Sequence, residues 1–78
     1  MPSRSKRRIL RYRKVAAALA RFGVEILPAS SGSHVKLRRG DNTTIIARHS
    51  DSQEYNAFVI AGVCRRLGID EEDFWSKV

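Results

Sequence analysis

Apolar residues in the first part of the chain recur every three or four positions, which is the spacing of one helix face. The pattern predicts a first helix that begins after the candidate N-caps Ser3 and Ser5, runs to about Phe22 and ends at Gly23. Its expected buried stripe consists of Tyr12, Val15, Ala16, Leu19, Ala20 and Phe22. The basic residues between these positions are left for solvent or a ligand.

Three short segments with β character follow this helix. Residues 24–27 are mainly apolar and stop at a proline, and residues 34–38 alternate between polar and apolar side chains. An alternation of period two indicates a strand with one buried face. The turn-forming residues 39–42 then predict a hairpin, with the β-branched residues 43–46 as its returning strand.

The inward face of the returning strand is not fixed by the sequence, because Ile45 and Ile46 are both apolar. If Ile46 faces the core, His49 lies on the same side of the sheet as His34. If Ile45 faces the core, His49 lies on the opposite side.

A second helix is predicted over about residues 54–67, ending at Gly68. Apolar residues at helical spacing predict its buried face, which consists of Ile60, Val63, Cys64 and Leu67. Asp70 is a candidate N-cap for a last short helix, from which Phe74 or Trp75 folds back onto the core.

These elements predict an α+β fold of order α-β-β-β-α, with a three-stranded antiparallel sheet and two helices packed on one of its faces. The length of 78 residues fits one domain. We expect residues 1–8 to be a basic N-terminal extension and residues 9–78 to form the single domain.

Positive charge is concentrated near the N-terminus. The formal net charge is +7, and residues 1–22 contain eight basic residues and no acidic one, whereas the rest of the chain is nearly neutral. A concentrated positive field attracts polyanions, which favours nucleic acid as a partner over a neutral metabolite. A basic face that only keeps the protein in solution is the simpler alternative.

Cys64 is the single cysteine, so an intrachain disulfide is excluded and a reducing, cytoplasmic location is expected. One cysteine and two separated histidines also do not form a zinc motif, and we expect no metal. The apolar run at residues 15–20 is too short for a signal peptide and for a membrane span. A mitochondrial transit peptide is the alternative that the acid-free, arginine-rich start leaves open.

A candidate catalytic group stands where the loop enters the second strand. His34 follows Gly32 and Ser33, which are expected to set the loop conformation, and it should share one strand face with Lys36 and Arg38. An imidazole exchanges protons near neutral pH, and the two cations suit a phosphodiester and favour the neutral imidazole. The simpler alternative is a polar surface residue at a strand edge.

Several short motifs together carry a family resemblance. In chain order they are Phe22-Gly23-Val24, Gly32-Ser33-His34, Arg48-His49-Ser50, Leu67-Gly68-Ile69, and an acidic segment that ends at Phe74. In this order and spacing, over about residues 10–75, the chain resembles the HicA-like (YcfA-like) toxins of type II toxin-antitoxin systems.

The resemblance implies a small mRNA interferase with a fold like the double-stranded-RNA-binding domain, a HicB-like antitoxin as partner and no cofactor. It implies metal-independent RNA cleavage with His34 as the catalytic residue. The ribose 2'-hydroxyl is the nucleophile in such cleavage, so the protein moves protons and stabilises charge on phosphorus. His49, or a water molecule, is the candidate for the second proton transfer. The residues expected to bind RNA are Lys36, Arg38, Arg7, Arg11, Lys14 and Arg48.

Two other functions remain open from the sequence. The first is a non-catalytic RNA-binding module of the same fold, which would read RNA shape through its basic helix. The second is a protein that uses this amphipathic helix to bind a membrane surface or an acidic protein.

Overall fold

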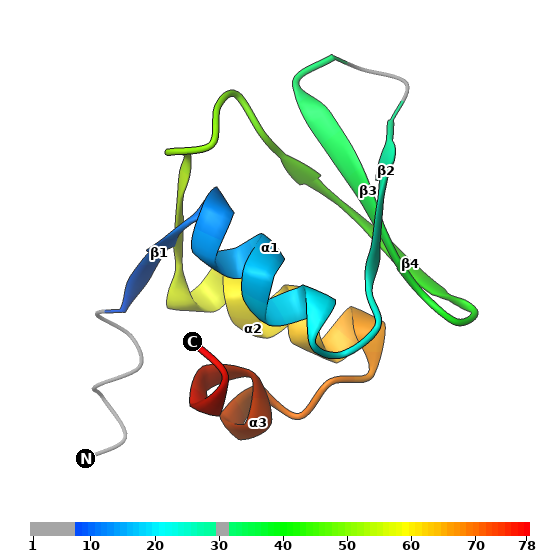
Figure 1. Ribbon diagram of the computed structural model, residues 1–78, viewed down its shortest axis with the longest axis vertical. Helices are drawn as coiled ribbons and strands as arrows, with labels where there is room; N and C mark the ends of the chain where they lie inside the picture. Colours follow the sequence, from blue (N-terminus) through cyan, green and yellow to red (C-terminus); the bar gives the residue numbers. More distant parts are fainter. Residues whose placement is uncertain (1–7, 30–31) are drawn as a thin grey trace.

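The computed structural model describes residues 8–29 and 32–78 of the chain (Figure 1). Its elements, in chain order, are β1 (Ile9–Arg11), α1 (Tyr12–Ala20), β2 (Glu25–Pro28), β3 (His34–Arg39), β4 (Asn42–Ala47), β5 (Glu54–Asn56), α2 (Ala57–Leu67) and α3 (Glu71–Ser76). No helix in this described part of the chain is long and apolar enough to span a membrane.

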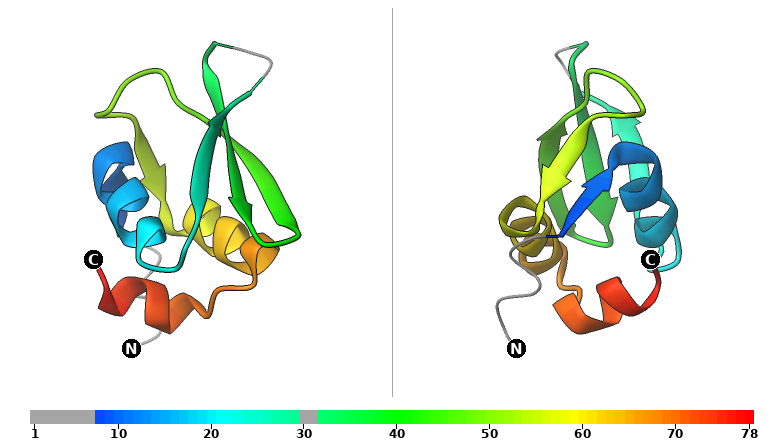
Figure 2. Two further views of the ribbon diagram at one scale, coloured as in Figure 1. Left: turned by 45° about the vertical axis from the view of Figure 1, so that its right-hand side comes forward. Right: turned by 90° about the vertical axis from the view of Figure 1, so that its left-hand side faces the viewer.

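The main sheet has three antiparallel strands in the order β2-β3-β4, which confirms the predicted α+β class and three-stranded sheet. The predicted hairpin joins β3 to β4, and Gly40 supplies the positive φ of 60° that its two-residue turn requires. A second, two-stranded sheet pairs β1 with β5, which the sequence did not predict. These two short strands come from distant parts of the chain and lie side by side in space (Figure 2).

The first helix is shorter than predicted. Residues 9–11 satisfy their backbone groups by pairing with β5, so α1 begins at Tyr12 instead of near the N-terminus. The backbone N–H of Tyr12 donates to the carbonyl of Gln53 at 2.8 Å, which satisfies one of the free donors at the helix start. The candidate caps Ser3 and Ser5 lie outside the described residues.

The second helix also begins later than predicted, because residues 54–56 form β5. The side chain of Asn56 caps α2 by accepting from the Val59 N–H at 2.9 Å. Gly68 ends this helix in the left-handed conformation, with φ of 71°, as predicted. Asp70 caps α3 as predicted, since its carboxylate accepts from the Asp73 N–H at 3.0 Å.

One hydrophobic core joins the helices to the inner face of the main sheet. The largest fully buried side chains are Phe74, Leu19, Leu37, Ile60, Leu67 and Cys64. On β4, Ile46 is buried whereas Ile45 is 58% exposed, so Ile46 is the residue that faces the core. We call the other side of this sheet, to which His34, Lys36 and Ile45 point, the outer face.

Candidate functional site

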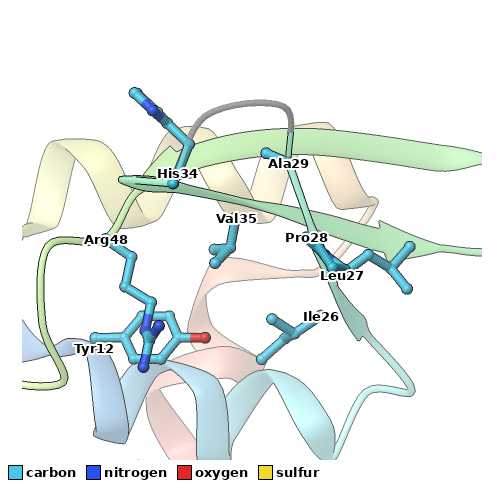
Figure 3. Close-up of a pocket in the computed structure, with 9 residues that line it drawn as sticks. Tyr12, Ile26, Leu27, Pro28, Ala29, His34, Val35 and Arg48 are labelled. Atoms are coloured by element: carbon cyan, nitrogen blue, oxygen red, sulfur yellow. The ribbon is translucent and has the colours of Figure 1, made fainter.

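His34 is the first residue of β3 and its side chain is exposed on the outer face. Its Nδ1 lies 3.5 Å from the hydroxyl oxygen of Ser33, and its register partner on β4 is Ala47. Figure 3 shows the imidazole pointing away from Val35, Arg48 and Tyr12 and into open space. The ring is therefore free to meet a ligand that approaches the outer face.

Gly32 and Ser33 precede this histidine as a turn. The Ser33 carbonyl accepts from the Arg48 N–H at 2.7 Å, which continues the β3–β4 pairing by one residue and fixes the backbone beside His34. A Cβ at Gly32 would meet nothing within 4 Å. No contact in the described chain therefore requires a glycine at this position, and its role in the loop conformation stays a prediction.

Lys36 and Arg38 share the outer face with His34, as predicted from the alternation of β3. Arg38 lies opposite Glu25 in the register, and its Nε and Nη2 donate to Glu25 Oε1 at 2.9 and 2.7 Å. A phosphate at Arg38 would therefore compete with a carboxylate. Lys36 is half-buried between Leu27 and Ile45 and is the cation on β3 best placed to serve His34.

Arg48 differs most from its predicted role as an RNA ligand. Its Nη2 donates to Asp51 Oδ1 at 2.5 Å, and its Cζ lies 4.7 Å from the centroid of the Tyr12 ring. The hydrogen bond to Asp51 raises the pKa of Arg48, and partial desolvation opposes this effect. Arg48 thus links the loop after β4 to the start of α1, and its guanidinium already has an anionic partner.

The remaining predicted RNA ligands lie near the N-terminus. Arg11 is exposed, and its Nε lies 3.9 Å from Glu54 Oε2, a distance at which an exposed pair adds little. Lys14 is exposed on α1, one turn further along. Arg7 lies outside the described residues. Arg11 and Lys14 form a basic patch at the start of α1 that a polyanion can reach.

His49 lies beyond the sheet. Because Ile46 faces the core, strand alternation alone would place His49 on the side of His34, but β4 ends at Ala47. His49 instead occupies an exposed bend, where its backbone N–H donates to Gln53 Oε1 at 3.1 Å. A role for His49 in proton transfer stays a prediction.

A pocket with a volume of about 460 Å³ opens between α1 and the β2–β3 hairpin, with His34 at its rim (Figure 3). Its lining residues are Tyr12, Ile26, Leu27, Pro28, Ala29, Gly32, His34, Val35 and Arg48. The walls of the pocket are mainly apolar. Its polar part is the guanidinium of Arg48, which is stacked on the ring of Tyr12. This pocket has no local signal in the sequence, because α1, β2 and β3 meet to form it and Tyr12 was expected in the core.

Comparison with known proteins adds no relative to this description. The chain matches no protein-family model, no curated protein and no solved structure. The function is therefore inferred from the residues and their geometry.

Proposed function

We propose that this chain is the toxin of a toxin-antitoxin pair, a metal-independent endoribonuclease that cleaves mRNA with His34 as general acid or base. The observation that carries the proposal is the exposed imidazole at the junction of loop and strand, with Lys36 two residues away on the same face. An imidazole beside a cation on an accessible surface suits a phosphodiester.

In the proposed reaction, His34 removes the proton of a ribose 2'-hydroxyl. The 2'-oxygen attacks the adjacent phosphorus, and the bond from phosphorus to the 5'-oxygen breaks. The leaving 5'-oxygen takes a proton from solvent or from a second group such as His49, which leaves a 2',3'-cyclic phosphate and a 5'-hydroxyl. Lys36 stabilises the negative charge that develops on the phosphoryl oxygens.

The proposal includes an arrangement like the double-stranded-RNA-binding domain, in which α1 and α2 pack on the inner face of the β2-β3-β4 sheet. The shared core supports it, since Leu19 of α1 and Ile60 of α2 are buried with Leu37 and Ile46 of the sheet. This packing leaves the outer face of the sheet open to RNA. It would make β1, β5 and α3 additions to the α-β-β-β-α arrangement.

The cytoplasmic partner in this proposal is a HicB-like antitoxin that neutralises the toxin. Co-expression of the protein encoded beside this chain tests the pairing, because a cognate antitoxin restores growth that the toxin arrests. If the neighbouring protein does not bind the chain and does not restore growth, the pairing is wrong.

Replacing His34 tests the nuclease directly. His34→Ala should lower RNA cleavage in EDTA by about 100- to 10,000-fold while RNA affinity is retained, because general acid–base catalysis is worth that much. His49→Ala, which removes the other exposed histidine, distinguishes the two sources of the second proton. Cleavage should fall if His49 donates that proton and stay unchanged if solvent does. Equal cleavage by the wild-type protein and His34→Ala would refute the assignment.

A non-catalytic RNA-binding module is the second candidate. It is favoured by the close ion pairs of Arg38 and Arg48, which occupy two of the cations near His34. In the basic patch, Lys14 is exposed and the pair of Arg11 with Glu54 is long, at 3.9 Å. This candidate predicts that purified protein binds RNA but leaves it intact, and that Lys14→Ala weakens binding more than Arg38→Ala.

A further inference from the structure

The edge of the main sheet at β4 offers backbone groups for pairing. The Arg48 N–H donates to the Ser33 carbonyl, so these two residues form a hydrogen-bonded pair. Bonded and non-bonded pairs alternate along an antiparallel ladder, so Val35 with Ile46 and Leu37 with Thr44 are also hydrogen-bonded pairs. The N–H and C=O groups of Thr43 and Ile45 therefore point away from β3. β4 is the last strand in the order β2-β3-β4, so these groups face the free side of the sheet.

Exposed apolar side chains gather beside this edge. Ile45, Phe58 and Val59 are 58%, 67% and 42% exposed. All three line one groove with a volume of about 550 Å³ between β4, β5 and α2, which we call the β4–α2 groove. A phenylalanine that is two-thirds exposed beside other apolar side chains marks an interaction surface.

Two cations stand at the far end of the same groove. On α2, Gly62 lies four residues after Phe58, and Arg65 and Arg66 lie three and four residues after Gly62, so all four share one face of the helix. A Cβ at Gly62 would lie 3.1 Å from Arg66 Nη1 and 4.0 Å from Arg65 Nη2, so both guanidinium groups lie over this glycine. The one acid in the groove lining, Glu54, has Arg11 as its ion-pair partner. The charge of the groove is therefore positive.

We propose that the β4–α2 groove binds an acidic, partly apolar segment of another protein, which adds as an extended strand to the edge of β4. Backbone groups of Thr43 and Ile45 would pair with this segment, its apolar side chains would cover Phe58 and Val59, and its carboxylates would meet Arg65 and Arg66. The Ala47 carbonyl is not available, because it accepts from the Tyr55 hydroxyl. Pairing is thus short, and side-chain contacts supply most of the affinity.

A second copy of this chain suits the groove less well. Its net charge is +7, so two copies repel each other, and the arginines at the groove would have to meet another basic surface. An acidic partner has the complementary charge. The inference goes beyond the proposed nuclease activity and does not depend on it, because the groove is formed by residues that take no part in the proposed cleavage.

Capped eight-residue peptides of alternating sequence test the groove. A valine–glutamate peptide should bind the full chain, and NMR titration should shift the backbone amides of Thr43, Ile45 and Val59. A valine–lysine peptide should bind at least about tenfold more weakly, because its charge matches that of Arg65 and Arg66. A valine–glutamate peptide with an N-methyl group on every residue should also fail, since neither of its edges can donate a backbone hydrogen bond to β4.

Variants of the chain provide matched controls. Phe58→Ser and Ile45→Thr should each weaken binding of the valine–glutamate peptide by about tenfold, whereas Ile9→Thr, which changes an equally exposed strand isoleucine, should not. Circular dichroism of each variant separates lost binding from lost folding. No RNA is present, so the result is independent of cleavage.

Three outcomes would overturn the inference. Equal binding of the glutamate and lysine peptides would show that the groove does not select an acidic partner. Concentration-dependent dimers that Phe58→Ser abolishes would make a second copy the occupant. Stronger binding to phosphatidylserine vesicles than to the peptide, lost in Phe58→Ser, would make the surface a membrane contact.

Discussion

The guanidinium of Arg48 lies over the ring of Tyr12, with 4.7 Å between Cζ and the ring centroid. The same guanidinium donates to Asp51, whose backbone carbonyl accepts from the Arg13 N–H at 3.3 Å. The segment after β4 and the first turn of α1 are therefore joined by both a side-chain stack and a backbone hydrogen bond. This connection lies next to the turn that precedes His34, because the Arg48 N–H donates to the Ser33 carbonyl.

Replacing Arg48 with lysine should lower the melting temperature by a few degrees. Lysine keeps the positive charge but lacks the planar guanidinium, which can stack on Tyr12 and donate to Asp51 at the same time. Thermal denaturation followed by circular dichroism measures the change. Arg21→Lys, at the exposed C-cap of α1, is the control and should leave the melting temperature unchanged. Equal melting of Arg48→Lys and wild type would show that the stack adds no stability.

The adjacent residues Arg38 and Arg39 should differ sharply in their contribution to stability. Arg39 donates from Nε to the Phe22 carbonyl at 3.0 Å and from Nη1 to the carbonyls of Leu67 and Gly68 at 3.0 and 2.9 Å. It thus joins the β3–β4 hairpin to the C-terminal ends of both long helices, where a cation is favourable.

We expect Arg39→Met to lower the free energy of unfolding by about 1–3 kcal/mol, because it leaves part-buried carbonyls without a donor. Arg38→Met removes only an exposed ion pair and should cost no more than about 1 kcal/mol. Urea denaturation of both variants measures the difference. If both lose the same stability, the three carbonyl contacts of Arg39 are not stabilising.

Glycine-to-alanine substitution should have opposite effects at the middle and at the end of α2. Gly62 has ordinary helical geometry, and a Cβ there meets only the flexible ends of Arg66, at 3.1 Å, and Arg65, at 4.0 Å. Gly62→Ala should therefore raise the free energy of unfolding by about 0.5–1 kcal/mol. Gly68 has a φ of 71°, so Gly68→Ala should lower it by about 1 kcal/mol or more. A stabilised Gly68→Ala would contradict the C-cap assignment.

The stability of the protein should fall at alkaline pH through Cys64. Burial, with a smaller contribution from the nearby carboxylates of Glu71 and Asp70, raises the pKa of the Cys64 thiol from 9.0 to about 11. The unfolded chain therefore loses this proton first. The stabilisation is complete below pH 9 and is lost as the pH rises to about 11.

Urea denaturation at pH 8 and pH 10.5 measures this loss, which should reach about 2 kcal/mol. Cys64→Ala should be less stable than the wild type at both pH values, because the substitution leaves a small cavity. Its free energy of unfolding should fall less between pH 8 and pH 10.5. Other groups titrate in this range, so the difference between the two proteins is the informative quantity. Identical falls would mean that Cys64 does not contribute.

Features that depend on neighbours in the sequence were predicted well. The alternation of residues 34–38, the turn at Gly40, the C-cap at Gly68 and the N-cap at Asp70 all match the structure. In each case a side chain or a special φ acts on backbone within a few residues, so the local sequence contains the whole cause.

Features that depend on distant partners were missed. Residues 9–11 continue the helical pattern of α1, and only the presence of β5 makes them a strand. Ile45 and Ile46 could not be distinguished until the core selected Ile46. The roles of Arg39 and Arg48 likewise depend on carbonyls and rings that folding brings together. Arg48 was therefore predicted to be a free cation, although it is paired with Asp51.

The pairing of β1 with β5 closes a loop that contains α1 and the whole main sheet. Such a closure costs conformational entropy before its few hydrogen bonds form, so this ribbon should be the last part of the fold to assemble. In native-state hydrogen exchange, the amides of residues 9–11 should lose protection well before that of Leu37. A chain shortened to begin at Tyr12 should then keep its hydrophobic interior while it loses the contacts of Arg8 with Trp75 and of Arg11 with Glu54.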